Sequence, residues 1–371
     1  MRKTLLVSLM ACALVACQGG GSDNESITIG YIGPLTGDAS PYGVDTLNGM
    51  LLKASEINAA GGINGKLIEI VTEDGRCTGA DAASAAQKLI HVDKVVAIIG
   101  GQCSGETLAA APIAEEAQIV MISPLSSSPD VTDAGDFIFR NYPSDALKTE
   151  AMAAYFVENG YEKIAVITEN TDFAIAFRDA LKKNLGEDAF VFDEVVEPNT
   201  KDFRSLITRL KDIEFDVFFP NGQSSATIGA MLQQVREQGF EQLAVSHDVA
   251  QDQSLLEIAP KASEGLQAIN VPAVSDDSEF GSKFLEEYGA TQAAMAFAAH
   301  AYDAMGVLAE AIGSVGTDSI AIRDYLNDLT AYEGVVGSFS FDPNGDVVGI
   351  PYVLWEVQDG AYVNLRNIDV N

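Results

Sequence analysis

The sequence predicts an α/β protein with two lobes, each built on a parallel sheet covered by helices on both faces. Short apolar strands alternate with helical stretches along most of the 371 residues. Two such runs follow one another, and a β-rich stretch ends the chain. After removal of about 26 N-terminal residues, some 345 remain, which is more than one ordinary hydrophobic core accommodates.

The first run extends to about residue 128. We expect strands over residues 27–32, 66–73, 95–99 and 119–122, and helices over 42–60, 80–92 and 104–117. Gly61 and Gly62 are suitable C-cap residues for the first helix. The strand at 95–99 is apolar throughout, which is typical of a parallel strand buried on both faces.

The second run begins after Tyr142 and Pro143. We expect helices over 145–159, 172–185, 203–213 and 225–238, and strands over 163–168, 189–196, 216–220, 242–246 and 265–270. Helices over 278–289, 293–312 and 319–329 precede β structure around 334–340, 352–357 and 362–365. This late return indicates several chain crossings between the lobes. Residues 27–141 plus 273–341 are assigned to lobe 1, and 142–272 plus 342–371 to lobe 2.

The N-terminus has the features of an export signal. Arg2 and Lys3 precede an apolar run over residues 4–16, which predicts a signal peptide at 1–16 and is too short to span a bilayer. Residues 14–17, Leu-Val-Ala-Cys, resemble a bacterial lipobox, which implies lipid attachment at Cys17. An ordinary signal peptide with an incidental cysteine is the alternative. Residues 17–26 are rich in Gly, Ser, Asn and Asp and are expected to form a flexible leash.

The composition is strongly acidic. The formal net charge is −32, and loss of Arg2 and Lys3 with the signal makes it two units more negative. Such a chain is a poor partner for nucleic acid or for anionic lipid. The acidic residues are distributed along the chain, as in a solvated surface. We therefore expect contact with the membrane only through the lipid anchor, and a monomer.

The cysteines indicate one disulfide. Cys12 leaves with the signal and Cys17 takes the lipid, so that Cys77 and Cys103 remain. Two remaining cysteines in an exported chain favour a disulfide between them. The closed loop would stabilise the fold by about 3–4 kcal/mol on the chain-entropy model. Whether the two Cα atoms lie within bonding range stays open.

Enzyme classes have weak support. Residues 101–105, Gly-Gln-Cys-Ser-Gly, have the form of a nucleophile elbow, and a thiol hydrolase would need His247 or His300 as its base. A disulfide at Cys103 would remove that nucleophile. No Gly-x-Gly-x-x-Gly follows the first strand, and the three histidines lack zinc spacing. We expect no enzyme, no cofactor and no metal.

Five segments resemble the leucine/isoleucine/valine-type periplasmic binding proteins: residues 29–37, 56–65, 99–104, 122–124 and 341–346. The resemblance implies the type I fold, with two doubly wound lobes joined by a multi-strand hinge. It also implies closure over a small amino acid, branched-chain type favoured, and delivery to the transmembrane subunits of an ABC permease. A receptor for amides, urea or other small solutes, and a sensor module, are alternatives on the same fold.

One side of the expected site follows the first-lobe strands. Ligands of open parallel sheets bind beyond the carboxyl ends of the strands. Ser104 is expected to cap a helix, whose free N–H groups attract a carboxylate. The resemblance places ligand contacts at Ser104, Leu125, Ser126 and Ser127, with the Leu125 carbonyl accepting from the ligand ammonium.

The other side follows the second-lobe strands. Asp248 matches the family's acidic residue for the ligand ammonium. Phe173 stands where the family commonly has tyrosine, so it can stack on a ligand but cannot donate a hydroxyl. Gln223 and Ser224 occupy the loop after the strand at 216–220, where the family often has an aromatic residue. Tyr42 matches an aromatic residue at the side-chain pocket.

Overall fold

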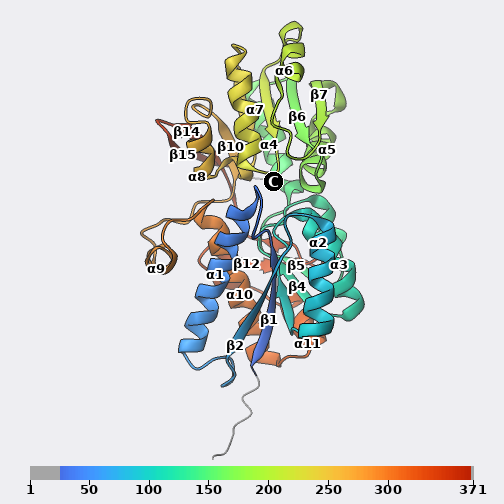
Figure 1. Ribbon diagram of the computed structural model, residues 1–371, viewed down its shortest axis with the longest axis vertical. Coiled ribbons are helices and arrows are strands. Elements are labelled where there is room, and N and C mark those ends of the chain that lie inside the picture. Colours follow the sequence, from blue (N-terminus) through green and yellow to red (C-terminus); the bar gives the residue numbers. More distant parts are fainter. Residues whose placement is uncertain (1–25, 369–371) are drawn as a thin grey trace, which may run out of the picture.

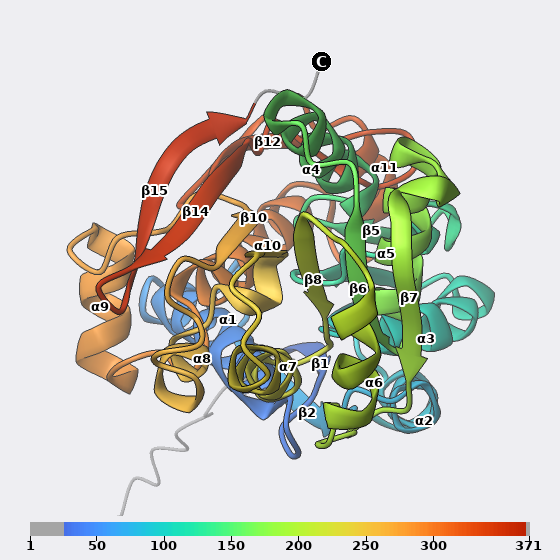
Figure 2. The same cartoon turned by 90° about the horizontal axis from the view of Figure 1, so that it is seen from above.

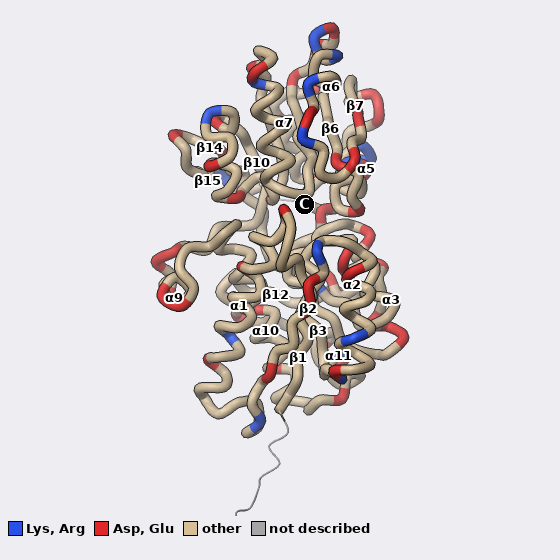
Figure 3. The backbone as a smooth tube through the Cα atoms, viewed as in Figure 1, with Lys and Arg blue, Asp and Glu red and all other residues tan. Residues whose placement is uncertain are grey.

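The computed structural model describes residues 26–368 of the chain, and it is an elongated molecule of two lobes (Figure 1). The predicted signal peptide (1–16), the lipid-bearing Cys17 and all but the last residue of the predicted leash (17–26) lie outside the described residues. Acidic residues are distributed over both lobes (Figure 3). The two lobes agree with the predicted fold class.

Lobe 1 contains a parallel sheet in the order β2-β1-β3-β4-β5. Its strands are β1 (Ile27–Gly33), β2 (Ile68–Asp74), β3 (Ala97–Ile99), β4 (Val120–Ser123) and β5 (Ile138–Arg140). Its helices are α1 (Ser40–Ala59), α2 (Gly79–Lys88), α3 (Ser104–Ala117), α10 (Met295–Val315) and α11 (Ser319–Asn327).

Alternate strand residues of this sheet enter different cores. Ile29 and Tyr31 of β1 pack with α1 and α10, whereas Ile32 packs with α2 and α3. Because successive side chains of a strand point to opposite faces, an apolar strand requires a helical layer on each side. The carboxyl ends of the strands are thereby left as the open edge.

Lobe 2 contains a sheet in the order β15-β14-β10-β9-β8-β6-β7. The parallel strands are β6 (Ile164–Glu169), β7 (Phe190–Val196), β8 (Val217–Asn221), β9 (Leu243–Ser246) and β10 (Gln267–Asn270). Two antiparallel strands, β14 (Tyr352–Gln358) and β15 (Ala361–Ile368), form one edge, seen from above in Figure 2. The helices are α4 (Asp145–Asn159), α5 (Asp172–Leu185), α6 (Arg204–Arg209), α7 (Ser225–Glu237) and α8 (Gln253–Ile258).

The chain crosses between the two large sheets three times. The first crossing joins β5 to α4, and the second joins β10 to α9 (Glu279–Tyr288) and α10. The third follows a small antiparallel sheet of β11 (Tyr332–Gly334), β12 (Gly337–Phe341) and β13 (Val347–Val348). Strand β13 lies beyond the boundary predicted at residue 342 and still pairs with β12. The boundaries of the lobes stay predictions.

The helices of lobe 2 show why local sequence predicts them well. Helices α4 and α5 have the predicted bounds. Ser144 and Thr171 accept first-turn N–H groups as N-caps, and Gly160 ends α4 in the left-handed conformation. The short elements β5 and α8 were not predicted. The predicted helix at 203–213 is α6 followed by a 3₁₀ turn, and α2 ends in a π turn at Leu89–Asp93.

Among the described residues, no single helix combines the length and the apolar character needed to cross a membrane. The pair of α10 and α11 satisfies both criteria only when taken together, and it is bent by 115°.

Candidate ligand-binding site

A cavity lies between the lobes, where the carboxyl ends of both sheets meet. It is lined from lobe 1 by Tyr42, Gln102, Cys103, Ser104, Leu125, Ser127 and Phe297, and from lobe 2 by Phe173, Gln223, Asp248 and Val249. We call Gln102, Cys103, Ser104, Leu125 and Ser127 the first wall, and the four lobe 2 residues the second wall. This position is the one expected for the ligand of an open parallel sheet.

The first wall begins at the N-terminus of α3. Cys103 is the N-cap and Ser104 is the first helical residue, so the prediction that Ser104 caps the helix is wrong. The Ser104 hydroxyl instead accepts the backbone N–H of Ser128, 3.1 Å away. This bond joins the start of α3 to the loop after β4.

A buried carboxylate and a disulfide hold this helix start. Glu106 accepts the backbone N–H groups of Cys77, Gln102 and Cys103 at 2.9–3.0 Å. Burial raises the pKa of Glu106 to about 7, although the three N–H donors oppose the rise. Cys77 and Cys103 form the predicted disulfide, with their Cα atoms 5.3 Å apart. Cys103 therefore has no thiol for the nucleophile elbow that the sequence allowed.

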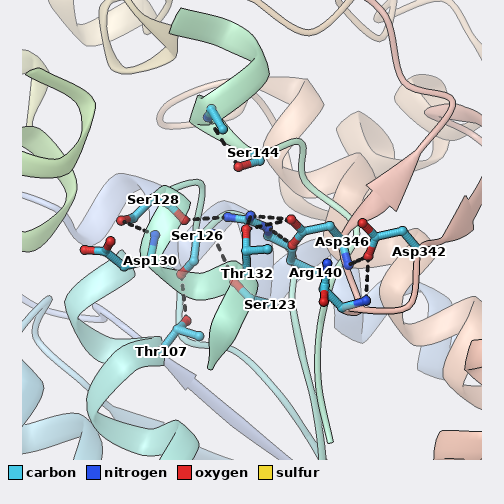
Figure 4. Close-up of polar contacts among 12 residues, drawn as sticks. Thr107, Ser123, Ser126, Ser128, Asp130, Thr132, Arg140, Ser144, Asp342 and Asp346 are labelled. Atoms are coloured by element: carbon cyan, nitrogen blue, oxygen red, sulfur yellow. Dashed lines mark hydrogen bonds and ion pairs between the residues drawn. The ribbon is translucent and has the colours of Figure 1, made fainter. Parts of the chain in front are cut away.

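The loop after β4 is fixed by its own hydrogen bonds. Ser123 Oγ donates to the Gly101 carbonyl at 2.6 Å and accepts from the Ser126 N–H at 2.9 Å. Ser126 Oγ lies 2.7 Å from Thr107 Oγ and donates to the Gly101 carbonyl at 3.0 Å. Because the Ser126 side chain points into lobe 1, it does not line the cavity (Figure 4).

Arg140 anchors the end of this loop. Its Nη1 donates to the Ser128 carbonyl at 2.7 Å, while Nε and Nη2 bind the Asp346 carboxylate at 2.5 and 2.8 Å (Figure 4). Asp346 lies in the tight turn begun by Asp342, which accepts its backbone N–H. The first wall is thus neutral at its surface and supported by an ion pair whose arginine is fully buried.

A buried cluster of charges lies behind the second wall and includes its residue Asp248. Lys148 Nζ lies 2.7 Å from Asp248 Oδ1 and 2.8 Å from Asp145 Oδ1. The Tyr142 hydroxyl donates to Asn270 Oδ1 at 2.6 Å and lies 3.4 Å from Asp248 Oδ2. All five residues are nearly inaccessible to solvent. Asp248, predicted from the resemblance to meet a ligand ammonium, therefore already has a cationic neighbour within the protein.

Burial and the neighbouring charges shift the pKa of each group in and beside the cluster. Burial raises the pKa of Asp145 to about 6, and the charge of Asp248 adds to the rise. Burial alone would also raise the pKa of Asp248, but the Lys148 ammonium holds it below its usual range. The two carboxylates outweigh burial at Lys148 and raise its pKa. Burial lowers the pKa of the adjacent His247 to about 3, so this ring is neutral at ordinary pH.

Aromatic side chains complete the cavity. The Tyr42 and Phe297 rings meet edge to face, with centroids 5.7 Å apart, and Phe173 packs against the His247 ring at 4.9 Å. The Tyr42 hydroxyl accepts the N–H of Ser225 at 3.2 Å and lies 3.3 Å from its Oγ. Since Tyr42 is on α1 and Ser225 begins α7, this contact spans the two lobes.

Residues 26–361 match the model of a protein family described as periplasmic binding protein. The chain belongs to that family. It is similar to the leucine-, isoleucine-, valine-, threonine- and alanine-binding protein of Pseudomonas aeruginosa, with 28% identity over 365 residues, 96% of this chain and 95% of the relative.

Two solved structures support the leucine/isoleucine/valine-type relationship predicted from the motifs. A leucine-binding protein of Thermotoga maritima has a TM-score of 0.83 and 28% identity, covering 92% of this chain and 99% of that one. A branched-chain amino acid transporter substrate-binding protein of Streptococcus pneumoniae, in complex with isoleucine, has a TM-score of 0.82 and 27% identity. It covers 92% of this chain and 100% of that one. The predicted family and type I fold are confirmed.

Seven of the nine predicted contact residues of this periplasmic binding protein line the cavity: Tyr42, Ser104, Leu125, Ser127, Phe173, Gln223 and Asp248. Ser126 points inward, and Ser224 caps α7 by accepting the Thr227 N–H at 3.3 Å. Their role in ligand binding stays a prediction.

Four lining residues were not predicted: Gln102, Cys103, Val249 and Phe297. Cys103 and Val249 adjoin the predicted residues Ser104 and Asp248, and Gln102 is two positions before Ser104, so their places in the chain were a usable signal. Phe297 belongs to α10, and nothing local marked it.

The described part of this periplasmic binding protein has no group of three or more His, Cys, Asp or Glu able to hold a metal ion. Proteins of this family are solute-binding receptors and not enzymes, and membership implies an exported protein.

Proposed function

We propose that this protein is a lipid-anchored, extracytoplasmic receptor of an ABC importer. In this proposal it captures a small α-amino acid, branched-chain type favoured, between two closing lobes. The observation that carries the proposal is the arrangement of the cavity. A helix N-terminus and a serine lie on one wall, a carboxylate lies on the other, and aromatic side chains lie between them.

The first wall suits the ligand carboxylate. The 14-residue helix α3 directs the free N–H groups of its first turn and the positive end of its dipole toward the cavity at Ser104. Ser127 adds a hydroxyl from the adjoining loop. No cationic side chain lines the cavity among the described residues, so backbone and hydroxyl donors would bind the carboxylate.

The second wall suits the ligand ammonium. Asp248 lines the cavity and keeps a depressed pKa, so it is ionised at neutral pH. Among the described residues, the one hydroxyl near its Oδ2 is that of Tyr142, at 3.4 Å, and this hydroxyl donates to Asn270 at 2.6 Å, so Oδ2 can accept another donor. The Leu125 carbonyl would be a second acceptor. A desolvated ammonium needs such charged and polar partners on several sides.

The remaining surface suits an apolar side chain. Tyr42, Leu125, Phe173 and Phe297 bring aromatic rings and a leucine to the cavity. Burial of a branched aliphatic group there would contribute roughly 1.5–3 kcal/mol. This favours a branched-chain amino acid over a charged one.

Contacts between the lobes support capture by closure. Besides the Tyr42–Ser225 contact, Lys201 Nζ lies 2.7 Å from Asp38 Oδ2 across the cleft. Both contacts would break when the lobes separate by rotation about the three crossings. The closed protein would then be the form that the permease subunits recognise, with Cys17 holding it at the membrane.

A thermal-unfolding screen tests the ligand. Saturating leucine, isoleucine or valine should raise the midpoint, since a ligand at 100 times its dissociation constant stabilises the native state by about 2.7 kcal/mol. Amides, urea and polyamines should leave it unchanged. The amino-acid assignment fails if no amino acid shifts the midpoint, and a shift with amides alone would favour the amide receptor.

The anchor and the transport role have separate tests. Cys17→Ser should move the protein from the membrane fraction to the soluble exported fraction, and unchanged partition would exclude lipidation. Liganded protein should stimulate ATP hydrolysis by its cognate permease complex. Lack of stimulation, together with amino-acid binding, would favour a sensor.

A further inference from the structure

The buried cluster of Asp145, Lys148 and Asp248 contains two carboxylates and one ammonium. Lys148 bridges the carboxylates at 2.8 and 2.7 Å, and its side chain is inaccessible to solvent. His247, whose Nδ1 lies 3.7 Å from Asp248, is neutral, and Arg140 is paired with Asp346. With both carboxylates ionised, the cluster carries a net charge of −1.

The three residues have unequal access to the cavity. Asp248 lines it, whereas Asp145 and Lys148 do not. Asp145 is the first residue of α4 and lies behind Ser127, whose carbonyl accepts the Asp145 N–H at 2.7 Å. The unbalanced charge therefore reaches the ligand only through Asp248.

An uncompensated buried charge is costly, and a cation of opposite sign that enters the site relieves that cost. The Lys148 charge is shared between two carboxylates, so Asp248 retains negative charge for a ligand cation. If Asp145 were neutral, Lys148 would balance Asp248 alone. The site would then have no charge for an ammonium to neutralise.

We propose that Asp145 is a specificity-determining residue that acts through Lys148. Because Asp145 is a second ion-pair partner of Lys148, the lysine neutralises Asp248 only in part. Asp248 therefore selects ligands carrying an ammonium over carboxylic acids of the same shape. This inference rests on the proposed function, because it names the residue that sets the charge preference of that site. Asp145 contacts no ligand and is a positioning residue.

The test compares each amino acid with its des-amino analogue by isothermal titration calorimetry. The pairs are L-leucine with 4-methylpentanoate and L-alanine with propanoate, at about pH 8, where a carboxyl of pKa about 6 is ionised. The ratio of dissociation constants is taken from the pair whose amino acid binds wild type more tightly. In that pair, wild type should bind the amino acid at least about a hundredfold more tightly than the analogue.

Asp145→Asn should reduce that ratio by at least about tenfold, weakening the amino acid and strengthening the anionic analogue. Asparagine keeps the size of the side chain and the backbone N–H bond to Ser127. The double variant Asp145→Asn/Lys148→Gln restores the net charge of −1 and should bring the ratio back to within about threefold of wild type. Asp145→Glu keeps a carboxylate at this position and should retain the wild-type ratio.

Glu150→Gln is the matched control, because it removes one negative charge from an exposed position of the same helix. It should leave the ratio unchanged. A merely structural role of Asp145 would weaken both ligands alike and would not be repaired by the double variant, so either result overturns the inference.

Other outcomes are also decisive. Leucine binding with an unchanged ratio in Asp145→Asn overturns the inference alone and leaves the proposed function standing. Failure of wild type to bind any amino acid overturns the proposed function and the inference with it. If Asp145→Asn does not fold, the double variant decides, since loss of the amino-acid preference there contradicts the charge argument.

Discussion

The two walls of the cavity are stabilised in different ways. The first wall presents neutral backbone and hydroxyl groups, and its buried ion pair of Arg140 and Asp346 lies behind the loop. The second wall presents a charged group, Asp248, whose ion-pair partner Lys148 lies buried behind it. The first wall can therefore receive an anion without losing an internal bond. The second must share Lys148 to receive a cation.

The largest expected effect concerns the support of the first wall. Arg140→Met leaves Asp346 with no ion-pair partner among the described residues and should lower the free energy of unfolding by about 3–5 kcal/mol. Urea denaturation measures it. Arg366→Met removes an exposed ion pair with Glu158 and should cost less than about 1 kcal/mol. Equal losses in the two variants would show that burial of the Arg140 pair is unimportant.

The disulfide gives the next effect. The variant Cys77→Ser/Cys103→Ser frees a loop with a sequence separation of 26 and should lower the free energy of unfolding by about 3–4 kcal/mol. Denaturation without reductant compares it with wild type, and added reductant should destabilise wild type only. Free thiols in unfolded, unreduced wild-type protein would contradict the disulfide.

Asp248 tests the second wall directly. Asp248→Ala should weaken amino-acid binding by at least about tenfold, because the ligand ammonium loses its charged acceptor while Lys148 keeps Asp145. Titration calorimetry gives the dissociation constant. Asp276→Ala, on an exposed turn, is the control and should not change it. An unaltered constant in Asp248→Ala would remove this residue from the site.

The smallest effect is on pH dependence. The pKa of Asp145 is raised to about 6, so acidification from about pH 8 to 5 protonates it and takes the cluster from −1 to neutral. The leucine preference over 4-methylpentanoate should therefore fall on acidification in wild type. In Asp145→Asn it should stay constant. A parallel fall in both proteins would assign the titration to another group.

The other groups that face Asp145 keep their charge over this range. The pKa of Asp248 is depressed by Lys148, that of Lys148 is raised by its carboxylates, and those of Tyr142 and Tyr352 are raised by burial. His247, with its pKa lowered to about 3, stays neutral. Glu106, whose pKa is about 7, lies behind the first wall, where the carboxylate of either ligand would bind. Its titration therefore affects the binding of both ligands alike and cancels in the ratio of their dissociation constants.

Patterns in the sequence were enough to predict most of the elements, the family and the sheet edge at which the cavity lies. Alternation of apolar strands with capped helices is local, so α4 and α5 have the predicted bounds. Ser104 and Ser127 could be found because they follow the ends of strands, and parallel strands bring those ends to one edge.

The directions and the partners of side chains depend on tertiary packing and could not be predicted from local patterns. Ser126 points inward because Thr107 and Gly101 offer it hydrogen bonds, which its place in the loop did not reveal. Phe297 reaches the cavity from α10. Lys148 meets Asp248 across 100 residues of sequence. A buried charge acquires its partner only when packing removes both from water, so the charge of this site is a property of the fold and not of any local pattern.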